Sequence, residues 1–332
     1  PPAPPLPGSP AHLLQAFAAE IAAARVLDPA CGSGNFLYVA LRHLLDLQKE
    51  VIAYAARKGL PDIPLTVGPE QLYGIEINEY AHELAQITVW IGYLQWRFDN
   101  GFADIGEPVL RPLGNIRHMD AILAHDEAGR PVEPEWPAAE VIVGNPPFLG
   151  DKKMRAELGD FYVDELRQIY KERIPGQSDL VCYWFERARE TLLRDKAQRV
   201  GLLATNSIRG GANQAVLKRI KADGDIFMAW SDRGWILDGA AVRVSIVGFD
   251  RGLQDHRVLD GRPVTVINSD LTTTLNLVSA RPLEENASLS FIGPSPHGRF
   301  DIPASLADRL LADQNSSSVS NADVVRPVVT AL

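Results

Sequence analysis

The chain has 332 residues, of which 46% are hydrophobic and 23% are charged. This is a globular composition, which excludes disordered, collagen-like and disulfide-scaffold proteins. No apolar run approaches the roughly 20 residues that a membrane span needs, and no signal peptide is recognisable. The two cysteines, Cys31 and Cys182, are too few for a disulfide framework, which favours a reducing, cytoplasmic compartment.

The formal net charge of −9 is unevenly distributed along the chain. Residues 1–150 contain 9 Lys/Arg and 18 Asp/Glu, whereas residues 151–332 contain 24 of each. An acidic chain argues against a dedicated nucleic-acid binder, because such proteins usually have a basic surface. Residues 194–221, however, carry seven Lys/Arg and one Asp. The whole-chain charge therefore says little about the partner of the second half.

In chain order, the pattern begins with a proline-rich stretch at 1–10, which predicts an extended tail. A helical spacing of apolar residues follows. Short apolar strands then alternate with helices, which is typical of a doubly wound parallel sheet. The helices of this first half are predicted at 11–24, 35–57 and 78–97, and the strands at 25–27, 72–75, 115–118 and 140–143.

The second half continues the same alternation. Helices are predicted at 153–172, 179–195 and 214–222, and strands at 199–205, 225–230 and 242–249. The seventh strand should be antiparallel and lie at the end of the sheet. We therefore predict an α/β fold with a doubly wound, mostly parallel, seven-stranded sheet. The predicted domains are a tail and lead-in helix (1–24), the sheet domain (25–260) and a β-rich connector (261–332).

A glycine-containing turn joins the first strand to the second helix. Two glycines permit positive φ angles and a close approach of the backbone to a ligand, and the turn leads into a helix N-terminus. The third glycine of a dinucleotide fingerprint and the lysine of a P-loop are both missing. We predict that this turn binds the anionic part of a cofactor through Asp28, Pro29, Ala30, Cys31, Gly32, Ser33, Gly34, Asn35 and Phe36.

Two acidic residues follow the next predicted strands. Glu76 ends the second strand, where a carboxylate can accept hydrogen bonds from ribose hydroxyls. Asp120 follows the third strand and could accept from an adenine amine. Either residue alone could be a helix cap or a solvated loop acid. Together with the glycine turn, and with their neighbours Ile77 and Ala121, they indicate an adenosine-containing ligand.

The fourth strand leads directly into Asn145, Pro146, Pro147 and Phe148. The prolines fix φ and remove N–H donors, and Asn145 is extended because it precedes proline. The result is a rigid tip that offers an amide oxygen, a carbonyl and an aromatic face. Two acceptors of this kind suit the exocyclic amine of a planar base. Phe148 would stack on that base. The side chain of Asn145 is also expected to border the cofactor.

The glycine turn at 28–34 followed by the tip at 145–148 resembles the amino-methyltransferases that act on adenine N6 in DNA, in the gamma order of motifs. Segments 150–155, 158–160, 162–164 and 179–185 resemble the MmeI-like, type IIL restriction–modification family. The resemblance implies a Rossmann-like, class I methyltransferase fold and S-adenosylmethionine (SAM) as cofactor. It also implies double-stranded DNA as partner, and nuclease and target-recognition regions in a longer parent polypeptide. On this view residues 261–332 contain, with the β-rich connector, the truncated start of a target-recognition domain.

The resemblance also implies roles for individual residues. The 28–36 turn would hold the methionine part of SAM, Glu76 its ribose, and Asp120 would lie near its adenine amine. Asn145 and Pro146 would bind the target N6.

A flipped base needs phosphate contacts on either side, because extrusion costs a few kcal/mol. We predict such contacts from Lys152, Lys153, Arg155 and Arg209, which follow the tip or a strand. The cluster of Lys218, Arg219 and Lys221 is interpreted instead as a solvated helix face. The seven histidines lack ligand spacing, so no metal is predicted.

Two alternatives remain open at this point. The same tip would suit RNA or a protein amide, since each presents a planar amine or amide. The chain could also be a non-catalytic SAM-binding module that regulates a partner.

Overall fold

The computed structural model describes residues 8–102, 112–237, 240–273, 302–313 and 320–327. Most of the expected extended tail at 1–10 lies outside these ranges. The chain separates into two compact units, Pro1–Val278 and Ser279–Leu332. The first unit contains the sheet and both predicted motifs.

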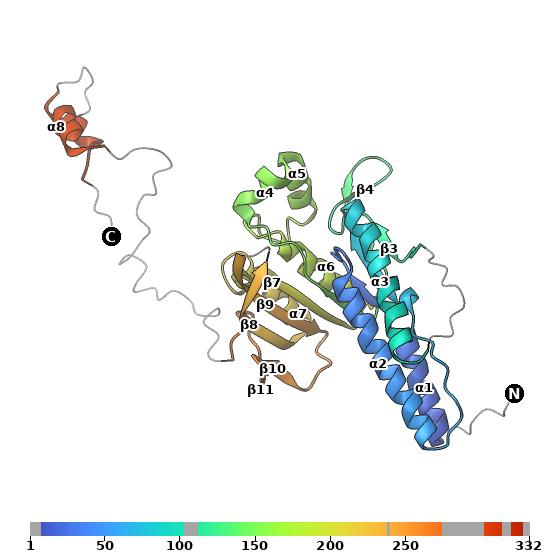
Figure 1. The fold of residues 1–332 in the computed structure, drawn as a ribbon. Coiled ribbons are helices and arrows are strands. Elements are labelled where there is room, and N and C mark those ends of the chain that lie inside the picture. Colours follow the sequence, from blue (N-terminus) through green and yellow to red (C-terminus); the bar gives the residue numbers. More distant parts are fainter. Residues whose placement is uncertain (1–7, 103–111, 238–239, 274–301, 314–319, 328–332) are drawn as a thin grey trace. The chain divides into compact units, whose positions relative to one another are not determined.

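The described strands of the first unit form a nine-stranded sheet in the order β11-β10-β8-β9-β7-β6-β1-β2-β3. Figure 1 shows the part of this sheet from β7 to β11. A two-stranded sheet, β4-β5, is separate from it. The strand bounds are β1 (Val26–Asp28), β2 (Leu72–Glu76), β3 (Ile116–His118), β4 (Ala124–His125), β5 (Pro131–Val132), β6 (Val141–Gly144), β7 (Arg199–Thr205), β8 (Asp225–Leu237), β9 (Ala240–Asp250), β10 (Arg257–Leu259) and β11 (Arg262–Val264).

The predicted doubly wound, mostly parallel sheet is confirmed. Strand β1 pairs in parallel with β2 on one side and with β6 on the other, so that Leu27 lies opposite both Tyr73 and Ile142. Strands β2 and β3, and β6 and β7, are also parallel. The direction of winding thus reverses beside β1, which is where ligands bind in sheets of this kind.

The seven predicted strands are all present, but the last is not at the end of the sheet. Strand β9 is antiparallel, as expected, and it lies between β7 and β8. Strands β10 and β11 extend the sheet beyond β8. Strand β9 follows β8 in a hairpin and runs back along it. It can therefore pair with β8 on one side and with β7 on the other.

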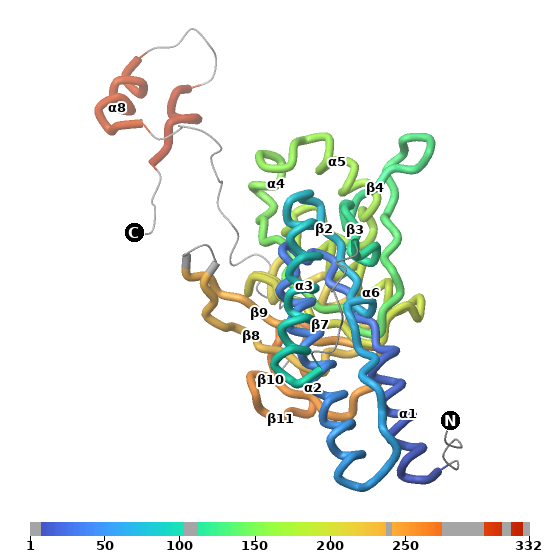
Figure 2. Tube along the Cα trace, turned by 45° about the vertical axis from the view of Figure 1, so that its right-hand side comes forward, coloured from blue at the N-terminus to red at the C-terminus, as the bar shows by residue number. Residues whose placement is uncertain are grey.

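Helices cover the two faces of the sheet. The helical segments of the first unit are α1 (Pro10–Ala23), α2 (Asn35–Arg57), η1 (Pro69–Gln71), α3 (Glu79–Asp99), α4 (Asp151–Leu158), α5 (Asp160–Ile169), α6 (Val181–Leu193), η2 (Asn206–Arg209) and α7 (Gln214–Asp223). Side chains alternate between the faces along a strand. Val26 therefore packs in a core with α1, α2 and α3, while Leu27 packs in another core with α5, α6 and α7. Figures 1 and 2 both show α1 beside α2.

The predicted helix at 153–172 is instead two helices. Helix α4 ends at Leu158, and α5 begins at Asp160. Gly159 between them has a φ of +85°, which breaks the helical path and turns the chain. After this turn, Leu158 and the Tyr162 side chain of α5 line one cavity with Pro29, Glu76 and Asn145, which lie at the carboxyl ends of β1, β2 and β6.

The predicted connector at 261–332 is described only in part. The described residues include β11 and, in the second unit, α8 (Ala304–Ala312) and η5 (Asn321–Asp323). Whether the segment is β-rich therefore stays a prediction, as do the domain boundaries. Among the helices in the described ranges, none is long and apolar enough to cross a membrane.

Candidate active site

The predicted glycine turn lies at the carboxyl end of β1. Gly32 and Gly34 have φ angles of +53° and +84°, which glycine adopts without strain. A Cβ atom on Gly34 would also lie 3.1 Å from the Cα of Ala85 in α3. Gly34 thus serves the turn and the close approach of two helices at once.

Asp28 lies beneath this turn rather than on its surface. Its side chain is fully buried, and its Oδ1 accepts a hydrogen bond from the Ala30 N–H at 3.0 Å. A Cβ atom on Gly144 would be 2.6 Å from that oxygen, so the glycine makes room for the carboxyl group. Burial raises the pKa of Asp28 to about 7. We infer that Asp28 shapes the turn from below.

Glu76 joins the turn to the start of α3. Its Oε2 accepts from the Gly32 N–H at 2.9 Å, and its Oε1 accepts from the Asn78 N–H at 2.8 Å. Each carboxylate oxygen keeps a lone pair for a further donor. The predicted ribose-binding position therefore holds the glycine turn in place as well.

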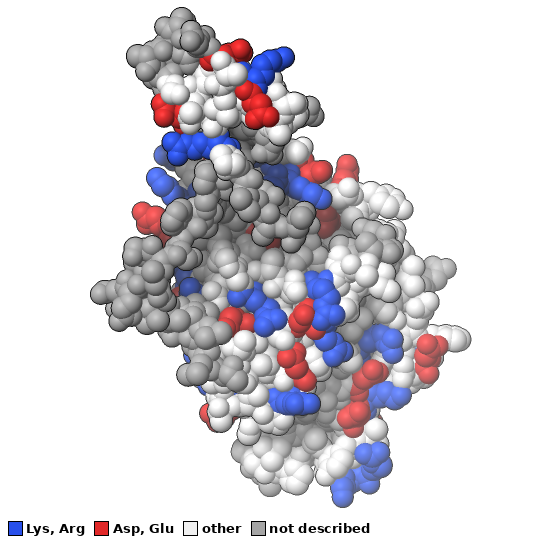
Figure 3. All heavy atoms as spheres, turned by 90° about the vertical axis from the view of Figure 1, so that its left-hand side faces the viewer, with Lys and Arg blue, Asp and Glu red and all other residues white. Residues whose placement is uncertain are grey.

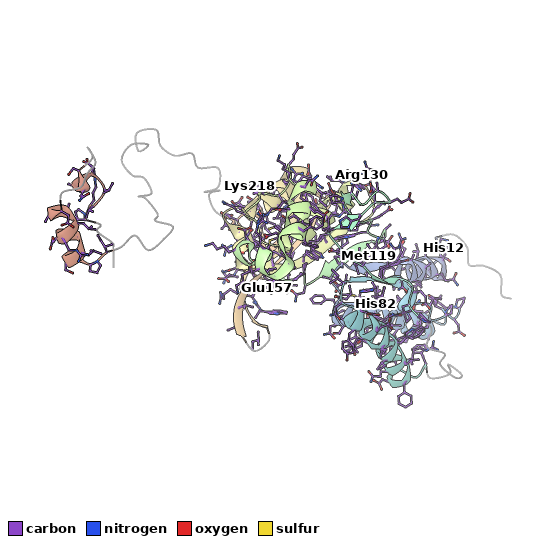
Figure 4. All side chains as sticks on the ribbon, turned by 90° about the horizontal axis from the view of Figure 1, so that it is seen from above. His12, His82, Met119, Arg130, Glu157 and Lys218 are labelled. Atoms are coloured by element: carbon purple, nitrogen blue, oxygen red, sulfur yellow. The ribbon has the colours of Figure 1, made fainter. Side chains whose placement is uncertain are left out.

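A cavity of about 410 Å³ opens in front of these residues. The predicted site residues in its wall are Pro29, Ala30, Glu76, Ile77, Asp120, Ala121, Asn145 and Pro147. Residues 31–36 of the turn, Pro146 and Phe148 are not part of that wall. The wall also contains residues that the sequence did not predict as site residues: Ile75, Met119, Leu149, Leu158, Tyr162, Leu180 and Trp184. Met119 lies toward the middle of the first unit in Figure 4.

Asp120 is held by three donors inside this cavity. Its Oδ1 accepts from the N–H groups of Ile122 and Leu123, at 2.8 and 3.1 Å. Its Oδ2 accepts from the Tyr162 hydroxyl at 2.7 Å. Burial, with the nearby Asp120 charge, raises the pKa of Tyr162, so its hydroxyl keeps the proton that it donates. The carboxylate is therefore fixed in position, with lone-pair capacity left on Oδ2.

The tip after β6 carries an unsatisfied acceptor. The Oδ1 atom of Asn145 is buried and has no hydrogen-bond partner among the described residues. Pro146 is buried, and Phe148 is half-buried with part of its ring against the core. An acceptor left in this state costs about 1–3 kcal/mol. Such a cost in the wall of a cavity points to a ligand that donates a hydrogen bond there.

The start of α6 supports both the tip and the turn. The Leu180 N–H donates to the Leu149 carbonyl at 2.9 Å, just after the tip. The Trp184 indole N–H donates to the Pro29 carbonyl at 2.9 Å. Residues 179–185, noted in the sequence only for a family resemblance, thus hold the two motifs together from one helix.

Comparison with known proteins agrees with this geometry. Residues 8–260 match the family described as the MmeI DNA-methyltransferase domain. The chain belongs to this family. The resemblance inferred from the two motifs is therefore confirmed.

Two similar proteins illustrate the relationship. The chain is 30% identical over 303 residues to DNA methyltransferase A of Bacillus subtilis (strain 168), which is 84% of this chain and 33% of that protein. The structure of the type IIL restriction–modification enzyme MmeI in complex with DNA shares the fold, with a TM-score of 0.64 and 24% identity, over 80% of this chain and 38% of that one. The chain thus spans between a third and two fifths of these relatives.

The basic residues expected to contact DNA differ in their surroundings. Lys152 and Lys153 are exposed on α4 and have no acidic partner in the described ranges. Arg155 pairs with Asp160 and Asp164, at 2.8 and 2.7 Å, so its charge is largely compensated. On the face shown in Figure 3, basic and acidic side chains are mixed rather than gathered in one basic patch. A position near the tip is therefore not sufficient evidence that a basic side chain contacts DNA.

The residues interpreted as a solvated helix face are mostly engaged with acids. Arg219 pairs with Glu186 at 3.2 Å, and Lys221 pairs with Asp225. Lys218 is exposed.

The two cysteines have packing roles. Both are buried and free, and burial raises the pKa of each thiol. A thiol in such surroundings is a poor nucleophile. No cluster of His, Cys, Asp and Glu suited to a metal ion occurs within the described parts of the chain.

Proposed function

We propose that this domain transfers the methyl group of SAM to the exocyclic N6 of a flipped adenine in DNA, as the modification part of a cytoplasmic restriction–modification protein. Membership of the MmeI DNA-methyltransferase family supports the reaction class. The buried, unpartnered Oδ1 of Asn145 carries the proposal, because it needs a donor such as an amine.

The cavity fits the proposed cofactor in its chemistry. Its wall combines apolar side chains, which suit a planar base, with the carboxylates of Glu76 and Asp120. Glu76 would accept from the ribose hydroxyls and Asp120 from the adenine amine. The glycine turn, held by Glu76 through Gly32, would bind the methionine part. Bound SAM supplies an electrophilic methyl group on its sulfonium sulfur.

Residues of the tip would position the nucleophile. Asn145 Oδ1 and the Pro146 carbonyl would accept hydrogen bonds from the two N6–H groups and turn the nitrogen lone pair toward the methyl group. Phe148 would stack on the extruded base with the part of its ring that the core leaves free. After transfer the nitrogen loses a proton to solvent, so no strong base is required.

The target base is inaccessible inside a duplex, so the proposal requires base flipping. Unstacking and unpairing cost a few kcal/mol, which contacts to the DNA backbone must offset. Sequence recognition would come from other regions of a longer polypeptide.

Transfer from labelled SAM tests this proposal. The substrates are an adenine-containing duplex, the same duplex with hypoxanthine in place of adenine, RNA, and a glutamine peptide. We expect label only in the adenine-containing duplex. Label in RNA or peptide would favour the alternative substrates, and SAM binding without transfer to any of them would favour a regulatory module.

Two variants complete the test. Asn145→Ala should abolish transfer while SAM still binds. Asn100→Ala is the control, because Asn100 caps the far end of α3. Loss of transfer in both variants, or in neither, would contradict the role of Asn145.

A further inference from the structure

A second cavity, of about 530 Å³, opens at the same edge of the sheet, after β7. Residues from η2 and the loop before α7 form most of its wall, including Ser207, Arg209, Gly210 and Gly211. It shares no wall residue with the cavity of the proposed active site. The roles proposed for the active site use none of its wall residues, although the sequence predicts a DNA contact from Arg209.

This second cavity lies beside the catalytic tip. Strand β6 leads into the tip and β7 into the cavity, and the two are parallel neighbours, with Gly144 opposite Leu202. Adjacent strands are about 4.8 Å apart. Asp179 also joins the two places: its Oδ1 accepts from the Asp151 N–H at 3.1 Å, and its Oδ2 accepts from the Ser207 hydroxyl at 2.8 Å. A molecule in the cavity would thus lie next to one bound at the tip.

The wall offers unused donors. Arg209 is half-buried, and its Nε donates to the Asp270 carbonyl at 3.0 Å, which fixes the guanidinium plane. Its two Nη atoms have no acceptor within the described ranges. The same holds for the backbone N–H groups of Gly211 and Ala212. A cation and backbone amides of this kind together suit a phosphate.

Three carboxylates lie near this arrangement, and each is engaged by other groups. Asp232, which interacts electrostatically with Arg209, pairs with Arg243 at 2.7 Å. Asp179 accepts from three donors, including the Asn213 amide at 2.7 Å. The Oδ1 of Asp270 accepts from the N–H and hydroxyl of Thr272, at 3.2 and 2.6 Å. Asp179 is therefore engaged by three protein donors and Asp270 by its own turn, whereas the guanidinium Nη atoms of Arg209 have no acceptor within the described ranges.

Gly210 provides an independent indication. Its φ of −148° is accessible to any residue, so the backbone does not require glycine here. A Cβ atom at this position would meet no protein atom within 4 Å, so packing does not require it either. The missing side chain leaves the backbone open to close approach by another molecule.

We propose that this cavity binds a phosphate of the DNA backbone next to the flipped nucleotide, through Arg209 and the Gly211 and Ala212 amides. The inference rests on the proposed function and adds the site that holds the strand while its base is extruded. Phosphate contacts fix the register of a protein on DNA and carry no sequence information.

Binding of the whole chain to a short mixed-sequence duplex, titrated with salt, tests the site. Each phosphate neutralised contributes about 0.9 to the slope of log K against log salt. Arg209→Ala should lower that slope by roughly one and weaken binding. Lys218→Ala is the control: Lys218 is exposed on α7, lies outside the cavity wall, and is labelled at the edge of the unit in Figure 4.

Alanine substitutions at two glycines, Gly210 and Gly176, compare DNA binding more sharply. Gly210→Ala should fold normally and weaken DNA binding roughly fivefold, by hindering the phosphate. Gly176→Ala has equally open space and also lacks a positive φ, but lies outside the cavity wall, and should bind as the unaltered chain does.

SAM affinity and methyl transfer are measured on the same samples. SAM affinity should be unchanged in Arg209→Ala and Gly210→Ala. Equal DNA binding by these variants and the controls, a loss of SAM affinity, or no salt-dependent binding by the unaltered chain would each overturn the site. Absence of methyl transfer with the slope difference intact would contradict the proposed function and leave the phosphate site standing as a DNA contact.

Discussion

Removing one hydroxyl group in Tyr162→Phe tests how the proposed cofactor cavity is built. The ring that lines the cavity remains, and only the 2.7 Å hydrogen bond to Asp120 Oδ2 is lost. A hydrogen bond to a charged group contributes about 1.5–3 kcal/mol. Asp120 is half-buried, so water can partly replace the hydroxyl, and we expect the lower end of that range.

The effect on SAM should be smaller than the effect on stability. The two N–H donors on Oδ1 still hold the Asp120 carboxylate near its position. We expect a loss of about 1 kcal/mol in binding, which is roughly a fivefold weaker affinity. Isothermal titration with SAM measures the affinity, and urea unfolding measures the stability.

Tyr170→Phe is the matched control. The Tyr170 hydroxyl is fully buried and donates to the Ile122 carbonyl at 3.0 Å, but Tyr170 does not line the cavity. Its loss should cost about 1–2 kcal/mol of stability, because a carbonyl is left unpaired, and should leave SAM affinity unchanged. Equal losses of affinity in both variants, or none in Tyr162→Phe, would refute the reasoning.

Three further predictions concern the glycine turn. Glu76→Ala should weaken SAM binding at least tenfold, since it removes the proposed ribose acceptor and the Gly32 contact. Unchanged affinity by titration would exclude that role. Because folding raises the Asp28 pKa to about 7, the free energy of unfolding should fall by roughly 4 kcal/mol as pH rises from about 4 to 7. Urea unfolding at several pH values measures this change, and Asp28→Asn should reduce it. Gly34→Ala should destabilise more than Gly59→Ala by calorimetry, because both have positive φ but only Gly34 also faces Ala85; equal losses would exclude the packing contribution.

Local sequence patterns were sufficient to predict the helices and strands around the site. Helix α2 spans the predicted residues 35–57, and β7 spans 199–205, because apolar spacing and glycine or polar boundaries specify such segments. The helix break at Gly159 also had a local signal, because a glycine interrupts the helical pattern there. The apolar periodicity of 153–172 nevertheless led to the prediction of one helix.

By itself, the sequence determined the parallel sheet, the glycine turn and the tip at 145–148, since each depends on residues adjacent in the chain. The tertiary structure alone decided the position of β9 between β7 and β8, and the contact of Tyr162 with Asp120. It also decided that Arg155 is paired whereas the Nη atoms of Arg209 are free. Such features join residues from separate elements, and local periodicity carries no information about which distant segments meet.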